Sequence, residues 1–425
     1  MMLRSVLASL AFAPLFLSTA SARATQLAPR ADSEDPEKVV EDSDLLSLHR
    51  DLCEIKSISD NEQEVGEFLV EYLESQDFTV KKQDVEHESD DATDKERFNV
   101  FAYPKGGDEK DIDVILTTHI DTVPPHIDYK VSANETTNKR EDIFISGRGT
   151  VDAKAGVAAQ TIAAIKYLEK NPDTKLGLLF VVGEESSGSG INAFSESDLN
   201  PDPTPYKAFI FAEPTNGKLA SGHKGMLSFT VNVTGVAGHS GYPWLSESAV
   251  SAALPILSRL DGLGEASKED GGLPRNDKYG NSTINIGKIE AGAASNVVPA
   301  SAIAECSIRI AEGTPKEVEK IVSKAVKEAC EEHDIDEDRV TVTFKTDEGY
   351  APVELDAEVD GFDVDVMHYG TDIPGLEIKG DAKVKIFLYG PGSIMVAHGE
   401  DEGLTVGQLE DSLEAYSKLI DAALE

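Results

Sequence analysis

The sequence predicts an α/β protein in which a mostly parallel sheet carries helices on both faces and a smaller α+β domain is inserted. Short apolar runs with strand composition alternate with helical segments over most of the chain, an order typical of parallel sheets. Between about residues 224 and 346 the order changes to strand, helix, two strands, helix and strand. This second order is the ferredoxin-like arrangement, which indicates a domain of a different kind.

The larger domain is expected to comprise residues 41–223 and to be completed by residues 347–425 after the inserted domain. Apolar residues at helical spacing predict helical structure over residues 42–76. An Ala-rich helix is expected to end near residue 170, and a final helix is expected over residues 407–425. The predicted strands are residues 78–83, 99–103, 113–118, 143–146, 175–182 and 206–211.

The inserted domain is expected over residues 224–346, because a complete supersecondary unit separates the two parts of the larger domain. Its predicted strands are residues 226–234, 282–289, 302–310 and 340–345, and its predicted helices are residues 246–260 and 315–332.

The composition allows two domains and disfavours nucleic acid as a partner. The chain has 425 residues, of which 28% are charged, so it can bury a sizeable core. Its 78 acidic residues outnumber 39 basic residues and give a formal net charge of -39 at pH 7. Such a surface repels phosphate backbones. It suits cation binding, although an acidic surface is usually only a solvated one.

The N-terminus has the features of a secretory signal peptide. Arg4 precedes an apolar run over residues 6–17 that is too short to span a bilayer, and Ala20-Ser21-Ala22 fits a cleavage site. We therefore expect residues 1–22 to be removed, residues 23–40 to form a disordered leader or pro-segment, and the mature protein to be extracellular. No later run is long and apolar enough to span a membrane, so no membrane partner is expected.

Secreted proteins can be glycosylated and can form disulfides, so the sequons and the cysteines are candidate sites for these modifications. Asn134, Asn232 and Asn281 each begin an Asn-X-Ser/Thr sequon and are candidate glycosylation sites. The three cysteines allow at most one disulfide, and Cys306 with Cys330 is the favoured pair because both lie in the inserted domain. The alternative is that these thiols are buried and unpaired.

Side chains with nitrogen or oxygen donors follow the predicted strands of the larger domain. His119 and Asp121 come after the strand at residues 113–118, and their spacing of two places them on the same face. In α/β sheets the carboxyl ends of strands form the rim that holds functional sites. A lone His or Glu on a loop is usually a solvated surface residue, but a set on one rim indicates a site. The other candidates are Asp152, Glu184, Glu185, Glu213 and His398.

These residue types are typical of a metal site with two ions. Two imidazoles with several carboxylates and no thiolate suit zinc, cobalt or manganese. The carboxylates suffice for one bridging Asp plus one carboxylate and one His for each ion, and such a pair of ions can hold a hydroxide and polarise a carbonyl. Glu184 and Glu185 are adjacent at a strand end, so one can bind a metal while the other serves as general base.

Seven motifs in a fixed order support a family resemblance that covers the chain from about residue 45 to residue 425. They read T-H-I-D-T-V-P, G-R-G-T-V-D-A-K-A-G, G-E-E, A-E-P-T, G-H-S, N-V-V-P and A-H-G-E-D-E. The chain resembles the secreted branch of the di-zinc metallopeptidases that include aminoacylase, acetylornithine deacetylase, desuccinylases and glutamate carboxypeptidase. The resemblance implies a zinc-peptidase-like catalytic domain with an inserted lid and dimerisation domain.

The resemblance also implies a role for each residue on the rim. Glu184 would be the general base, and Asp121 would hydrogen-bond the ring of His119 and set its tautomer. Family members often have a cis peptide bond after the bridging Asp, which here is Asp152–Ala153. The implied zinc ligands are His119, Asp152 and Glu213 for one ion, and Asp152, Glu185 and His398 for the other.

Residues outside the rim resemble the family's substrate-binding positions. His239 would stabilise the oxyanion of the tetrahedral intermediate, and in dimeric relatives this His comes from the partner subunit. Asn296 would accompany it. Arg309 would grip the substrate carboxylate with its planar fork, and the alternative reading is a surface ion-pair partner. Gly392 lies in a Gly-Pro-Gly loop whose backbone amides would meet the same carboxylate. The resemblance thus implies a homodimer through the lid domain.

The function implied is that of a secreted zinc-dependent carboxypeptidase, which hydrolyses an amide bond next to a free C-terminal carboxylate. A hydroxide bridging two Zn2+ ions per subunit would attack, with Glu184 as general base and with Co2+ or Mn2+ as substitutes for zinc. One alternative is an aminoacylase or deacylase that acts on N-acyl amino acids. Another is a catalytically silent binding or assembly protein, against which the complete ligand set argues.

Overall fold

A computed structural model describes residues 35–87, 95–266, 271–346 and 348–425. The expected signal peptide, residues 1–22, lies outside the described residues. Among the described residues, no helix combines the length and the apolar composition needed to cross a bilayer.

Three helices begin the described chain, namely α1 (Pro36–Glu41), α2 (Asp44–Glu54) and α3 (Gln63–Ser75). The side chain of Asp35 caps α1, whose first residue is a proline, and both features favour a helix start. Val40 is completely buried, and α1 packs against α2. The expectation of a disordered leader as far as residue 40 was therefore wrong for residues 36–40, because their apolar side chains join the core.

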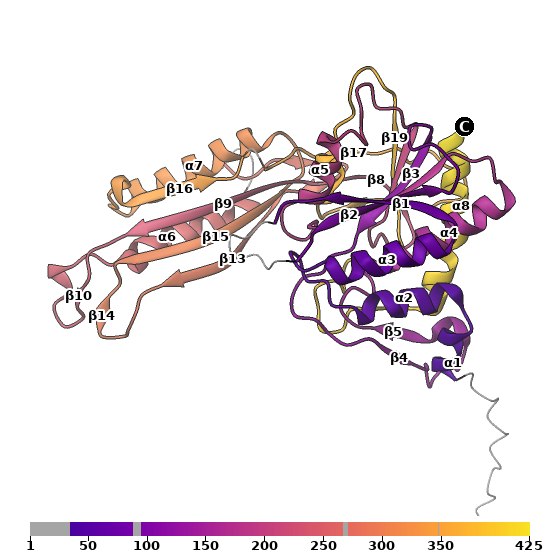
Figure 1. Cartoon of the computed structure of the whole chain (residues 1–425). Helices are drawn as coiled ribbons and strands as arrows, with labels where there is room; N and C mark the ends of the chain where they lie inside the picture. The colour runs from indigo at the N-terminus through magenta and orange to yellow at the C-terminus, as the bar shows by residue number, and fades with distance from the viewer. Residues whose placement is uncertain (1–34, 88–94, 267–270, 347) are drawn as a thin grey trace, which may run out of the picture. The chain divides into compact units, whose positions relative to one another are not determined.

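The central sheet has six strands in the order β1-β2-β6-β3-β7-β19. Figure 1 labels β1, β2, β3 and β19 of this sheet. The four strands β6, β3, β7 and β19 are parallel to one another, while β1 and β2 add antiparallel pairs at one edge. The mostly parallel sheet is thus confirmed. The strands are β1 (Phe78–Asp84), β2 (Phe98–Pro104), β3 (Val114–His119), β6 (Leu176–Val181), β7 (Ala208–Phe211) and β19 (Lys385–Leu388).

Helices cover both faces of this sheet, and alternating side chains divide between them. Leu178 and Phe180 of β6 pack with α2, α3, α4 (Lys154–Lys170) and α8 (Val406–Leu424). Leu179 and Val181 point to the opposite face, where α5 (Ser189–Glu196) packs. Every residue of β3 and β6 is buried, as expected for central strands covered on both faces.

Two small sheets join the last part of the chain to the first. One has the order β20-β5-β4, so that β20 (Gly403–Thr405) pairs with β5 (Phe144–Ser146). This pairing brings the segment around His398 next to the loop after residue 146. The remaining elements of these sheets are β4 (Lys130–Ser132), β8 (Leu219–His223), β17 (Val353–Glu354) and β18 (Val364–Met367), with the 3-10 helices η1 (Arg140–Asp142) and η5 (Ile373–Gly375) nearby in the chain.

The inserted domain has the expected ferredoxin-like topology. Its four strands lie in the order β13-β15-β9-β16, and every neighbouring pair is antiparallel. Alternate residues of β9, such as Phe229 and Val231, are buried in a core shared with α6 and α7. The main elements are β9 (Gly225–Thr234), α6 (Ala249–Asp261), β13 (Thr283–Ala291), β15 (Ser301–Ile310), α7 (Pro315–Glu332) and β16 (Val340–Phe344). The short elements are β10 (Gly238–His239), η2 (Pro243–Leu245), η3 (Gly262–Gly264), β11 (Arg275–Asn276), β12 (Gly280–Asn281), β14 (Val297–Val298) and η4 (Glu337–Arg339).

The favoured disulfide between Cys306 and Cys330 is not formed. Both thiols are free and buried, and both pack in the apolar core of the inserted domain. Burial raises the pKa of Cys306 to about 11, so its thiol stays protonated and behaves as a small apolar group. Cys53 is likewise free and buried.

We expect Val40→Ser to lower the free energy of unfolding of the larger domain by about 2–3 kcal/mol, because it removes a buried apolar side chain and buries a hydroxyl. Urea unfolding followed by circular dichroism measures the change. The control is Glu41→Ser, which alters an exposed residue of the same helix. Equal stabilities of the two variants would contradict the packing of α1 against the core.

Candidate metal centre

Three neighbouring parallel strands bring the first candidates together. His119 is the last residue of β3, which lies between β6 and β7 in the sheet. Glu184 and Glu185 follow β6, and Glu213 follows β7. Because these strands are parallel, their carboxyl ends meet at one edge, and the side chains converge there.

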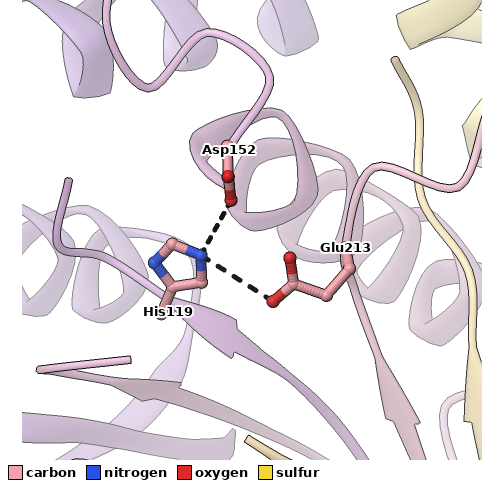
Figure 2. Close-up of side chains that lie close together, drawn as sticks. All are labelled: His119, Asp152 and Glu213. Carbon is pink, nitrogen blue, oxygen red and sulfur yellow. Dashed lines mark hydrogen bonds and ion pairs between the residues drawn. The ribbon is translucent and has the colours of Figure 1, made fainter. Parts of the chain in front are cut away.

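The first cluster consists of His119, Asp152 and Glu213 (Figure 2). The Nε2 atom of His119 lies 3.1 Å from Oδ1 of Asp152 and 3.7 Å from Oε1 of Glu213. One donor atom from each residue lies within 4.8 Å of the other two, which is close enough for a single ion. All three residues are buried.

The second cluster consists of Asp152, Glu185 and His398. The Nε2 atom of His398 lies 3.3 Å from Oδ2 of Asp152 and 3.0 Å from Oε2 of Glu185. Asp152 therefore presents one oxygen to each cluster. The two clusters are the ligand sets that the resemblance implies, and their nitrogen and oxygen donors fit zinc. The peptide bond between Asp152 and Ala153 is cis.

Asp121 is completely buried beneath the first cluster. Its carboxylate lies 3.4 Å from Nδ1 of His119, and that nitrogen also lies 3.1 Å from the backbone carbonyl oxygen of Asp121. The carboxylate accepts hydrogen bonds from the backbone amides of Glu184 and Glu185, each at 3.2 Å, and from the hydroxyl of Ser59 at 2.7 Å. Asp121 thus holds the turn that carries both glutamates as well as the ring of His119.

Glu184 lies beside the clusters but belongs to neither of them. It lines a cavity of about 460 Å³, within the range of small-molecule sites. Burial raises the pKa of Glu184 well above its ordinary value, and the nearby carboxylates of Asp372 and Glu185 act in the same direction. A carboxyl group with a raised pKa is suited to accept and return a proton near neutral pH.

Arg309 of the inserted domain lines the same cavity as Glu184. Its Nη1 atom lies 3.3 Å from the sulfur of Met226. Gly370 lies directly against Tyr350 and Arg309. A Cβ atom at this position would lie 1.9 Å from the Tyr350 hydroxyl and 2.9 Å from Nη1 of Arg309. The structure therefore supports a cavity position for Arg309 rather than the alternative of a surface ion pair.

Three predicted substrate residues do not line this cavity. His239, the last residue of β10, and Asn296, which directly precedes β14, are exposed. The amide of Ser240 donates to the carbonyl of Asn296 at 3.1 Å. Gly392 is buried against Val151, and a Cβ at that position would lie 2.8 Å from a methyl group of Val151. Roles for His239 and Asn296 in a partner's site, and for the Gly392 loop at the substrate carboxylate, stay predictions.

The cavity contains residues that the sequence reasoning missed, among them Asp372, Tyr350 and Tyr369. Asp372 is 8% exposed, and burial raises its pKa to about 7. It follows the short strand β18 by five residues, so the rule that picked out polar residues after strands could have found it. The strand itself was not predicted, because only four residues form it.

The two histidines carry raised pKa values in the metal-free protein. Hydrogen bonds to Asp152 and Glu185 raise the pKa of His398 to about 10. Burial opposes protonation of His119, but hydrogen bonds to Asp121 and Asp152 prevail and raise its pKa well above its ordinary value. The raised pKa values favour protonation of both imidazoles, so a metal ion that binds there competes with protons.

This competition predicts that metal affinity rises with pH. Between pH 6 and pH 8 we expect the association constant to increase about tenfold per pH unit for each ion that displaces one proton. Titration of the metal-free protein with zinc, in competition with a chelator of known affinity, measures the slope. His333→Ala, which changes an exposed histidine of the inserted domain, should keep the slope of the wild type. A constant affinity over this range would contradict the proton displacement.

Known proteins are similar to this chain in sequence and in architecture. Residues 221–336 match the family model described as a peptidase dimerisation domain. A protein of Ajellomyces dermatitidis named "Probable carboxypeptidase" is 53% identical over 400 residues, which are 93% of this chain and 91% of that protein. A tripeptidase from Staphylococcus aureus superposes with a TM-score of 0.67 at 19% identity over 89% of this chain and 98% of that chain.

A metallo-carboxypeptidase of family M20 from Sulfolobus solfataricus superposes with a TM-score of 0.63 at 16% identity, over 90% of this chain and 99% of that chain. The superpositions establish the fold, and the sequence identity over nearly the whole chain establishes the family. The chain therefore belongs to the M20 family of metallopeptidases, and its inserted domain is the dimerisation domain of that family.

Proposed function

We propose that this protein is a secreted carboxypeptidase that uses two zinc ions to hydrolyse an amide bond beside a free C-terminal carboxylate. The observation that carries the proposal is the position of Asp152, whose two oxygens face a different histidine each. A single carboxylate shared in this way suits a pair of ions better than one ion. The names of the curated relatives support peptides rather than N-acyl amino acids as substrates.

The residues of the cavity have different roles in the proposed reaction. When bound, zinc supplies a Lewis acid that polarises the scissile carbonyl and lowers the pKa of water. Glu184 lies in the cavity without belonging to a ligand set, so its carboxylate is free to take a proton from the attacking water and to deliver it to the leaving amine. Arg309 offers a planar pair of donors to the substrate carboxylate in the same cavity.

The proposal also includes secretion of the protein and its assembly into a homodimer. The apolar run at residues 6–17 and the cleavage motif after it support secretion. The side chains of Asn232 and Asn281 are exposed, which would allow glycosylation. The match to a dimerisation domain supports a homodimer, in which His239 and Asn296 would serve the partner's site. The exposed side chains of Trp244 and Leu245 lie close to His239 in the sequence and suit such an interface.

Removal of metal should abolish hydrolysis, and zinc should restore it. We expect purified protein treated with a chelator to lose at least about 99% of its activity on a C-terminal dipeptide substrate, because both the polarising charge and the water site are lost. Activity should return as zinc is added and should reach a plateau at two equivalents. Full activity of the metal-free protein, or a plateau at one equivalent, would contradict the two-ion proposal.

Glu184→Gln should separate catalysis from metal binding. Since Glu184 is outside both ligand sets, we expect two zinc ions to stay bound while kcat falls about 10²–10⁴-fold. Steady-state kinetics together with measured zinc content tests this. Glu400→Gln removes a charge two residues from His398 at an exposed position, and it should leave kcat within about threefold. A kcat of wild-type size in Glu184→Gln would reject the role of general base.

A further inference from the structure

Two buried charged residues, Arg148 and Glu402, lie behind the candidate metal centre and touch both of its loops. Arg148 is 3% exposed and Glu402 is 1% exposed. Their side chains form an ion pair with a distance of 2.6 Å between Nη1 of Arg148 and Oε2 of Glu402. Neither residue lines the cavity or belongs to a metal cluster, so the proposed chemistry does not use them.

Glu402 holds the loop that carries Asp152. Its Oε1 atom accepts hydrogen bonds from the backbone amides of Val151 at 3.1 Å and of Asp152 at 3.2 Å. Its backbone carbonyl accepts from the amide of Gly147 at 3.0 Å, next to the pairing of β5 with β20. The same side chain therefore fixes the main chain of the shared ligand and pairs with Arg148.

Arg148 holds the loop that carries His398. Its Nη2 atom donates to the carbonyl of His398 at 3.2 Å, and its Nη1 atom donates to the carbonyl of Gly399 at 3.3 Å. His398 has a φ angle of 64°, in the left-handed region that a residue with a side chain rarely adopts. Hydrogen bonds to this carbonyl and to the next one stabilise that conformation, which aims the imidazole at Asp152 and Glu185.

An ordinary buried ion pair would explain the charges but not their other contacts. Buried ion pairs add little net stability, because removing both charges from water offsets their attraction. Here the carboxylate of Glu402 also accepts from the amides of Val151 and Asp152, and Arg148 also donates to the carbonyls of His398 and Gly399. The Nε atom of Arg148 donates to the carbonyl of Pro125 at 3.3 Å. The planar guanidinium can serve Glu402 and two carbonyls at once, which a lysine ammonium on a flexible stem cannot do in the same geometry.

We propose that Arg148 and Glu402 form a ligand brace. This brace is a pair of positioning residues that holds Asp152 and His398 at the right distance and angle to each other for the metal ion of the second cluster. The brace couples two segments 250 residues apart, so that the site is preformed before metal arrives. This inference rests on the two-ion site of the proposed function. It concerns how the ligands are placed and adds no group to the reaction itself.

Arg148→Lys tests the brace through metal binding. The metal-free protein is titrated with cobalt(II), and the visible absorption of bound cobalt reports each site. We expect the affinity of the site with His398 to fall about 10–100-fold, as is usual when residues that orient ligands are changed, while the site with His119 and Glu213 stays within about threefold. The variants His398→Ala and His119→Ala provide reference spectra for the separate sites.

Arg140→Lys is the matched control, because Arg140 and Glu410 form another Arg–Glu pair that joins η1 to α8 away from the ligand loops. It should bind two cobalt ions with wild-type affinities. Wild-type affinities in Arg148→Lys, or an equal loss at both sites, would overturn the brace, since an equal loss is what general destabilisation produces.

Glu402→Asp supplies a second, independent test, and it decides the question if Arg148→Lys does not fold. It keeps the charge but shortens the side chain, so the carboxylate no longer reaches the amides of Val151 and Asp152. Because Asp152 is shared, both sites should weaken, but the site with His398 should lose at least about tenfold more, since Glu402 also orients Arg148 against the loop of His398. An equal loss at both sites would overturn the brace here too. Unchanged affinities would overturn the brace while leaving the proposed function intact. A wild-type protein that binds fewer than two ions would instead overturn the proposed function.

Discussion

The candidate centre depends on one buried carboxylate, that of Asp152, which lies between two imidazoles. Burial alone would raise its pKa, but hydrogen bonds to His119 and His398 hold that pKa below its ordinary value. A buried carboxylate is costly unless positive charge or hydrogen-bond donors face it from every side. Here the imidazoles of His119 and His398 face the two oxygens of Asp152 at 3.1 Å and 3.3 Å. The same arrangement places the donor atoms of both clusters around one carboxylate.

The fold supplies the two histidines from distant parts of the chain. His119 comes from the centre of the parallel sheet, where the carboxyl ends of β3, β6 and β7 converge. His398 comes from the returning segment, which the pairing of β20 with β5 places next to the loop that carries Asp152. The ferredoxin-like domain between them contributes Arg309 to the cavity, so residues of both domains line it.

Much of this arrangement was predictable because it follows from local patterns. Buried parallel strands are continuous apolar runs, so β3 and β6 were identified within one residue at their starts. Polar residues that follow such strands gather on one rim, and this rule identified His119, Asp152, Glu185 and Glu213. His398 was added from the returning segment, and the family resemblance implied the two ligand sets. The helix α1, the free thiols of Cys306 and Cys330 and the packing of Gly392 were not predictable, since each depends on neighbours that are distant in sequence.

The family, the order of the elements and the residue types at the centre could be inferred from the sequence alone, since these depend on periodicity, composition and motifs. Three features became visible only in the folded chain: which oxygen of Asp152 faces which histidine, the place of Asp372 and the tyrosines in the cavity, and the link that Arg148 and Glu402 make between the two ligand loops. Distances of about 3 Å between residues as far apart as 254 positions are set by packing of the whole chain, and no local pattern encodes them.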